Sequence, residues 1–183
     1  MPLRDRSMLM ISRPHAAGAA VALFGLGALG GASAQTPAGA FGGQGDTVTW
    51  TASAPAAGVK PGSRLAITLH GAVQGGWHVY ALNQLPEGPT PLRVMVDSSE
   101  AATAEGAPSG SAPTKIHDPA FDLETQFYAG AFTVTAPVRI GSHLAAGRQL
   151  IPVSVRFQTC NGRICQPPKT VHLSVPIDVR AKG

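Results

Sequence analysis

Short runs in which apolar and polar residues alternate recur between residues 47 and 179. Leu65, Ile67 and Leu69 share one side of such a run, and Phe132 and Val134 share one side of another. A period of two places successive side chains on opposite faces of a β-strand, so each run predicts a strand with one buried face. The expected strands are Thr47–Thr51, Arg64–Val73, Trp77–Leu82, Leu92–Val96, Tyr128–Ile140, Leu150–Gln158 and Thr170–Val179.

Gly and Pro residues separate these runs, and no segment shows a convincing helical period longer than two turns. Seven or more short strands with such turn signals predict an all-β sandwich of antiparallel strands. Pro137, Pro152 and Pro176 lie inside expected strands. Because proline has no N–H to donate, these strands are expected to be edge strands or to carry bulges. Residues 97–115 are poor in apolar side chains and are expected to form a long surface loop.

The N-terminal segment has the pattern of a cleavable export signal. Arg4, Arg6 and Arg13 precede an apolar run from about Ala16 to Gly31, and the small residues Ala32–Ala34 follow it. This order of charged, apolar and small residues is typical of a secretory signal peptide. A membrane anchor is the alternative, but the run is short and Gly-rich, whereas a span needs about 20 strongly apolar residues.

Cleavage after Ala34 would divide the chain into three parts. They are a signal peptide at residues 1–34, a flexible Gly/Ala/Pro-rich tail at residues 35–46 and one β-sandwich domain at residues 47–183. The formal net charge of the whole chain is +4, and the predicted domain has no strongly basic stripe. A nucleic-acid partner is therefore not expected. No other stretch is long and apolar enough to cross a membrane, so the mature chain is not expected to insert into one.

The only two cysteines, Cys160 and Cys165, are the candidate chemistry of the chain. Alternating strand residues precede them, a β-prone run follows from Thr170, and Asn161-Gly162 between them is a dipeptide that readily forms tight turns. Facing residues of antiparallel strands have Cα atoms about 4.5–5.5 Å apart, which is within disulfide range. The pair is therefore expected near a hairpin tip and, in an oxidising compartment, as a disulfide.

This disulfide has two interpretations. A crosslink that closes about six residues stabilises a fold by roughly 2 kcal/mol in the entropy model, so it is a weak brace. Two sulfurs on one exposed turn suit thiol–disulfide exchange, and Arg163 between them, with Arg156 upstream, would favour a thiolate. The spacing alone leaves both interpretations open.

A metal site is the remaining alternative for the cysteines. Two thiolates separated by four residues lack a second pair of ligands at the spacing of zinc sites. The histidines after the signal segment are scattered and are interpreted as ordinary strand or loop residues: His70, His78, His117, His143 and His172. No metal and no other cofactor is expected.

Several segments resemble the N-terminal periplasmic domain of DsbD, the thiol:disulfide interchange protein. They are Gly76–Tyr80 (GWHVY), Gly88–Pro91 (GPTP), Tyr128–Val134 (YAGAFTV), and Phe157–Cys160 (FQTC) followed by Cys165–Pro168 (CQPP). Their order and spacing cover most of residues 60–177, and the cysteine-containing piece is the most specific. The resemblance implies an immunoglobulin-like β-sandwich whose cysteines accept electrons from a membrane partner and pass them to periplasmic oxidoreductases.

The resemblance also implies roles for individual residues. In such domains a cap loop shields the sulfurs until a partner docks, and residues 117–122 match its position, with Phe121 as the shield and Asp118 as the nearby acid. Tyr80 would lie beside the cysteines, Cys165 would attack downstream partners, and Cys160 would resolve. Ordinary alternatives stay open: Phe121 as a loop anchor in the core, Tyr80 as a strand aromatic and Asp118 as a turn residue.

The predicted function is a periplasmic thiol–disulfide exchange protein that passes electrons between a reduced donor and oxidised partners. Its expected partners are thioredoxin-fold proteins or membrane thiol–disulfide electron-transfer proteins, and the chain is expected to be a monomer. No segment resembles the membrane domain or the C-terminal thioredoxin-like domain of the full transporter, so a stand-alone version is expected. Whether the protein is an enzyme stays open. The alternative is a non-catalytic periplasmic adaptor or surface module with a structural disulfide.

Overall fold

The computed structural model describes residues 46–181, and within them the chain forms twelve strands and no helix. No helix long and apolar enough to cross a membrane occurs among these residues. The predicted signal peptide at residues 1–34 and nearly all of the predicted tail at residues 35–46 lie outside the described residues.

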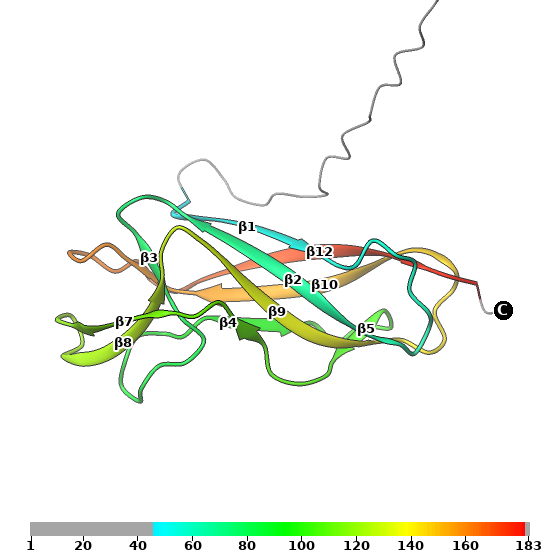
Figure 1. Ribbon diagram of the computed structural model, residues 1–183, viewed down its shortest axis with the longest axis horizontal. Helices are drawn as coiled ribbons and strands as arrows, with labels where there is room; N and C mark the ends of the chain where they lie inside the picture. The colour runs from blue at the N-terminus through cyan, green and yellow to red at the C-terminus, as the bar shows by residue number, and fades with distance from the viewer. Residues whose placement is uncertain (1–45, 182–183) are drawn as a thin grey trace, which may run out of the picture. The chain divides into compact units, whose positions relative to one another are not determined.

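The strands form three sheets in which every strand pair is antiparallel (Figure 1). The first sheet contains β1 (Val48–Ser53), β2 (Arg64–Val73), β9 (Ala131–Ile140), β5 (Ala102–Ala104) and β6 (Ser109–Gly110). The second contains β12 (Lys169–Val179), β10 (Gly147–Phe157) and β4 (Arg93–Val96). The third contains β11 (Thr159–Cys160), β3 (His78–Tyr80), β8 (Leu123–Tyr128) and β7 (Thr114–Asp118). The predicted all-β immunoglobulin-like sandwich is confirmed.

The core lies where the inward faces of the sheets meet. Alternate residues of β2 and β10 point into it, and Ile67, Leu69, Val153 and Val155 are all fully buried. Trp50 on β1 is also fully buried, and its ring packs against Phe132 and Phe157 with both centroid distances at 5.4 Å. Burial of each such side chain contributes about 1.5–3 kcal/mol, so the alternating positions are the main source of stability.

Two predictions about chain segments are wrong in detail. The expected loop at residues 97–115 contains β5, β6 and the start of β7. These short strands pair through backbone hydrogen bonds, such as Glu105 N–H to Pro137 O at 2.9 Å, and such pairing needs no apolar side chains. The expected single strand Tyr128–Ile140 is divided, because the chain turns at Gly130, which adopts a φ of 65°, and passes from β8 in one sheet to β9 in another.

The edge-strand prediction holds for only one of the three prolines. Pro176 lies on β12, which is at an edge of its sheet. Pro152 lies on β10, between β12 and β4, and Pro137 lies on β9, between β2 and the β5 and β6 strands. Pro152 is tolerated because the β4 ladder ends at Val153. Pro137 falls where β9 passes from β6 to β5, opposite neither strand.

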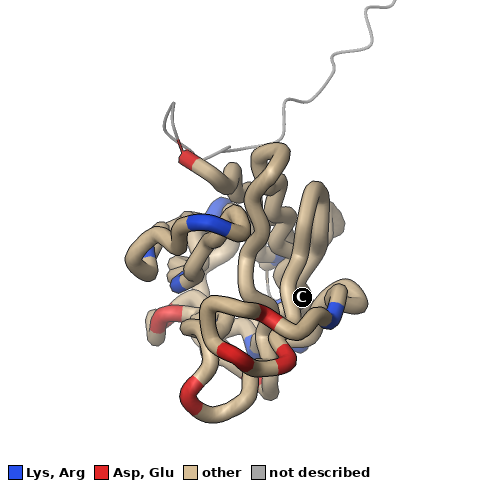
Figure 2. Tube along the Cα trace, turned by 90° about the vertical axis from the view of Figure 1, so that its left-hand side faces the viewer, with Lys and Arg blue, Asp and Glu red and all other residues tan. Residues whose placement is uncertain are grey.

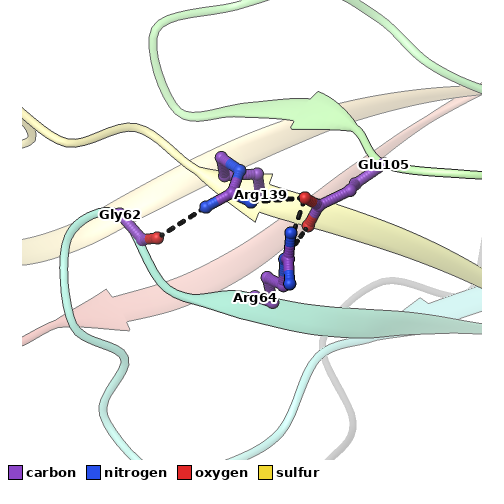
Figure 3. Close-up of polar contacts among 4 residues, drawn as sticks. All are labelled: Gly62, Arg64, Glu105 and Arg139. Atoms are coloured by element: carbon purple, nitrogen blue, oxygen red, sulfur yellow. Dashed lines mark hydrogen bonds and ion pairs between the residues drawn. The ribbon is translucent and has the colours of Figure 1, made fainter.

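A charged cluster within the first sheet joins Glu105, the residue after β5, to Arg64 on β2 and Arg139 on β9 (Figure 3). The Glu105 carboxylate accepts hydrogen bonds from Arg64 Nε at 2.8 Å and from Arg139 Nη2. The hydrogen bond from Arg64 and the charge of Arg139 lower the pKa of Glu105 below its ordinary value. The arginines are largely exposed, so solvent screens the cluster, and its main effect is to fix the segment's position.

Candidate functional site

The disulfide between Cys160 and Cys165 closes a tight turn, as predicted. Their Cα atoms are 4.1 Å apart, and the two residues form an antiparallel bridge. The Asn161 side-chain oxygen accepts hydrogen bonds from the backbone N–H groups of Arg163 and Ile164 at 3.1 and 3.0 Å. Gly162 takes a φ of 80°, which glycine adopts without strain. The turn residues therefore hold the two cysteines face to face.

The two sulfur-bearing residues differ in exposure. Cys160 is only 2% exposed because it ends β11, which pairs with β3. Cys165 lies beyond the turn and is exposed. Cys165 is therefore the more accessible of the two residues, and Cys160 lies against the interior of the domain.

Tyr80 and Asp118 lie directly beside the buried sulfur. The Tyr80 hydroxyl is 2.8 Å from Asp118 Oδ2, 3.1 Å from Cys160 Sγ and 3.8 Å from Cys165 Sγ. Tyr80 is fully buried and Asp118 is 5% exposed. Burial, followed by the hydrogen bond to Asp118, raises the pKa of Tyr80 well above its ordinary value, so the phenol keeps its proton near neutral pH.

Residues 117–122 form the end of a β-hairpin, which we call the cap hairpin and define as β7, β8 and the turn 119–122. Asp118 Oδ1 accepts a hydrogen bond from Ala120 N–H at 2.9 Å, and Asp118 O accepts one from Phe121 N–H at 3.2 Å. The Phe121 ring stands edge-on to Tyr80, with centroids 5.8 Å apart. Figure 1 shows β7 and β8 at the same end of the domain as the orange segment that includes the cysteine turn.

A pocket of about 300 Å³ lies between the cap hairpin and the cysteine turn. Its walls combine both cysteines and the turn between them with residues of β3 and the cap hairpin: His78, Tyr80, Ile116, Asp118, Pro119, Ala120, Gly162, Arg163 and Ile164. Phe121 is not part of the lining; it is half-buried against Tyr80. Of the predicted site residues, the structure thus brings five to the pocket and places Phe121 behind one of them, so the role of Phe121 as a shield stays a prediction.

Three residues of this pocket were not predicted from the sequence: His78, Ile116 and Ile164. His78 was interpreted as an ordinary histidine, although it stands two positions before Tyr80 and therefore on the same face of β3. Ile116 and Ile164 are 40% and 61% exposed and line the pocket from the cap hairpin and from the cysteine turn. The period-two spacing was a usable signal for His78, whereas the exposed isoleucines become visible only when the fold brings their segments together.

Charged residues are prominent at this end of the domain. Figure 2 faces the side that is on the left in Figure 1, and Asp and Glu positions dominate the loops in its lower half. On the cap hairpin, His117 and Asp122 are paired at 2.9 Å, and Lys115 and Glu124 at 3.3 Å. Because all four side chains are largely exposed, these pairs contribute little to stability and mainly shape the field met by an approaching partner.

The fold and the pocket define a class: an immunoglobulin-like β-sandwich with an accessible disulfide at one end, under a hairpin cap. Residues 48–176 match the family model described as thiol:disulfide interchange protein DsbD, N-terminal. The chain belongs to this family, and with its disulfide-forming cysteine pair it is a thiol–disulfide exchange module.

One similar solved structure is the N-terminal periplasmic domain of ScsB from Proteus mirabilis, with 17% sequence identity and a TM-score of 0.46. The match covers 74% of this chain and 48% of that chain, so the present chain spans about half the length of that structure. No curated protein matches the chain.

Replacing Tyr80 with phenylalanine is expected to destabilise the domain by about 1–3 kcal/mol, because it removes the closest donor to the buried Asp118 carboxylate. The wild-type free energy of unfolding is also expected to fall as pH rises above about 10. The raised pKa of Tyr80 means that the folded state keeps a proton that the unfolded chain releases there. Urea unfolding at neutral pH and above pH 10 measures both effects, and Tyr80→Phe should show the weaker alkaline loss.

A double-mutant cycle with Asp118→Asn is the control for this prediction. The two side chains are in direct contact, so their effects on the free energy of unfolding are expected to be non-additive by at least about 0.5 kcal/mol. Strict additivity of the two single substitutions would show that the Tyr80–Asp118 hydrogen bond does not contribute to stability.

Proposed function

We propose that this protein is a thiol–disulfide electron carrier that passes electrons between a reduced donor and oxidised partner proteins through Cys160 and Cys165. The observation that carries the proposal is the asymmetry of the pair. One sulfur-bearing residue is exposed beside an apolar-walled pocket, and the other is buried next to the Tyr80 hydroxyl. A permanent brace needs neither feature, and the loop that the bond closes is short.

The electron-accepting half of the cycle begins when a donor thiolate attacks Cys165 Sγ. The Cys160–Cys165 bond breaks, and its electron pair leaves on Cys160 Sγ as a thiolate, which gives a mixed disulfide between Cys165 and the donor. The donor's second thiolate then attacks the donor sulfur of that mixed disulfide and releases Cys165 as a thiolate. The donor is oxidised to a disulfide, the pair gains two electrons, and two protons from solvent complete the dithiol.

The reverse reaction delivers the electrons. The exposed Cys165 thiolate attacks the disulfide of an acceptor protein, which breaks that bond and releases one acceptor sulfur as a thiolate. The Cys160 thiolate then attacks Cys165 Sγ in the mixed disulfide, re-forms the Cys160–Cys165 bond and releases the second acceptor sulfur, so the acceptor leaves as a dithiol after protonation by solvent. These roles agree with the difference in exposure, because the sulfur that meets partners must be reachable and the resolving sulfur need not be. The hydrogen bond between Tyr80 and Asp118 would keep the Tyr80 hydroxyl beside Cys160 Sγ while the protein accepts electrons and while it delivers them.

Thioredoxin-fold proteins and membrane thiol–disulfide transporters are the proposed partners. Ile116 and Ile164 are exposed apolar residues that line the same pocket as Cys165, a surface suited to a partner with its own apolar rim around a reactive cysteine. The exchange is proposed to occur in the periplasm. The family of the domain and the signal-peptide pattern of residues 1–34 both support that location.

The test is a redox titration of the folded protein, combined with reduction by a thioredoxin-fold protein supplied in catalytic amounts. The proposal expects a reduction potential above about −300 mV, the level below which structural disulfides typically lie. It also expects the thioredoxin-fold protein to accelerate reduction well beyond its rate with dithiothreitol alone. A pair that stays oxidised in both experiments while the domain remains folded would instead support a non-catalytic adaptor.

A further inference from the structure

His78 is a half-buried polar side chain to which the exchange steps above give no role. It lies on β3 directly opposite Cys160 of β11 in the antiparallel register, and it lines the same pocket as both sulfurs. Directly opposed residues of antiparallel strands point to the same face, with Cβ atoms about 4.5–5.5 Å apart. The side chain of His78 is therefore a neighbour of the Cys160 side chain.

The imidazole is held firmly but lacks a hydrogen-bond partner at one nitrogen. Its ring stands edge-on to Tyr80 at a centroid distance of 5.2 Å and packs at 4.7 Å against Phe127. The Nε2 atom is buried, and no hydrogen-bond partner for it occurs among the described residues. A buried nitrogen without a hydrogen-bond partner destabilises the folded protein. A state of the site in which Nε2 has a partner would remove this cost.

Opening of the disulfide creates a need for such a partner. Cys160 is almost fully buried, and a buried thiolate is strongly disfavoured unless donors surround it. The Tyr80 hydroxyl has one proton, and the Asp118 carboxylate competes for it at a shorter distance, 2.8 Å against 3.1 Å to Cys160 Sγ. Asp118 itself can only accept when ionised, and the Thr125 hydroxyl of the cap hairpin already donates to Asp118 Oδ2 at 3.4 Å.

We propose that His78 is a positioning residue for the reduced state, which donates a hydrogen bond from Nε2 to the Cys160 thiolate when the disulfide opens. The inference rests on the proposed function. It adds a second hydrogen-bond donor, besides the Tyr80 hydroxyl, for the Cys160 thiolate that leaves when the disulfide opens. The neutral imidazole with its hydrogen on Nε2 is sufficient, and no proton changes hands. A better-stabilised leaving thiolate departs faster, so His78 would accelerate attack on Cys165.

The electrostatic surroundings agree with a neutral donor. Burial lowers the pKa of His78, and the Asp118 charge opposes that shift only in part. The other titratable or charged groups that line the pocket are Tyr80, which stays protonated, the two cysteines, and Arg163 on the exposed turn. Near neutral pH, His78 is thus a neutral hydrogen-bond donor.

The test measures the thiol pKa of Cys160 in a Cys165→Ser background, from the ultraviolet absorbance of the thiolate against pH. His78→Phe is expected to raise that pKa by about one unit, which is about a tenfold loss of thiolate at a fixed pH below the pKa. His78→Gln keeps an N–H donor on a side chain of similar length, and it is expected to recover part of the shift. His70→Phe is the matched control, because His70 is exposed on β2 and bonded to Thr133.

An unchanged Cys160 pKa in folded His78→Phe would overturn the inference, and so would equal shifts in His78→Phe and His78→Gln. Urea unfolding identifies any variant that fails to fold. If His78→Phe does not fold, the test is the comparison of the Cys160 pKa in His78→Gln with that in the protein that keeps His78. The measurement uses no partner protein. A wild-type domain that no thioredoxin-fold protein reduces would therefore defeat the proposed function without affecting the His78–Cys160 result.

Discussion

Cys160→Ala is expected to react with 5,5′-dithiobis(2-nitrobenzoic acid) at least about a hundredfold faster than Cys165→Ala, because only the former leaves an exposed thiol. In Cys165→Ala the remaining thiol is 2% exposed, and the reagent reaches it only after local opening of the β11–β3 pair. Each variant has one cysteine and neither has the disulfide, so the comparison isolates accessibility. The measurement is the second-order rate of thiol modification at neutral pH.

The same asymmetry predicts which variant traps a partner. Cys160→Ala should accumulate a stable mixed disulfide with a thioredoxin-fold protein, since no internal thiol remains to resolve it. Cys165→Ala should accumulate little. Equal rates of modification in the two variants, together with equal trapping, would contradict the assignment of Cys165 as the attacking sulfur.

Trp50→Ala is expected to lower the free energy of unfolding by about 3–5 kcal/mol, the range for removal of a large aromatic side chain from a core. Trp50 is fully buried and contacts the rings of Phe132 and Phe157, which belong to two different sheets. The loss is a large part of the stability of an ordinary domain, about 5–15 kcal/mol. Urea unfolding followed by circular dichroism measures it.

Trp77→Ala is the matched control for this prediction. The chemical change is identical, but Trp77 is only partly buried and packs at the margin of the core. Its substitution is expected to cost less than half as much, because less apolar surface returns to water and a smaller cavity forms. A comparable loss in the two variants would mean that the Trp50 contacts between the sheets are not the centre of the core.

The cap hairpin lies beside the disulfide and contacts the residues around its buried sulfur. The cap hairpin carries Asp118, which bonds Tyr80 across the pocket, and Tyr80 in turn touches the buried sulfur. A partner that displaces the turn 119–122 would also disturb the hydrogen bonds that the Asp118 carboxylate accepts from Ala120 N–H and that the Asp118 carbonyl accepts from Phe121 N–H. Displacement of this short hairpin by a partner would therefore also change the polar surroundings of Cys160.

The amino-acid sequence by itself determined the strands of the core and the local geometry of the disulfide. Alternation along β2, β10 and β12 assigned inward residues such as Ile67, Val153 and Leu173, which are buried in the structure. Asn161-Gly162 between two cysteines predicted the tight turn that holds them together. Both features depend on neighbours within a few positions of the chain, and local patterns report such neighbours directly.

Only the tertiary structure decided which sulfur is reachable and what surrounds the other. Cys160 is buried because β11 pairs with β3, a segment about 80 residues earlier, and that pairing also brings His78 and Tyr80 to the sulfur. The segment at residues 97–115, poor in apolar side chains, contains strands because β5 and β6 pair with the backbone of β9 and the start of β7 pairs with β8. Backbone hydrogen bonding and burial between distant segments leave no period in the sequence, so no local pattern could specify them.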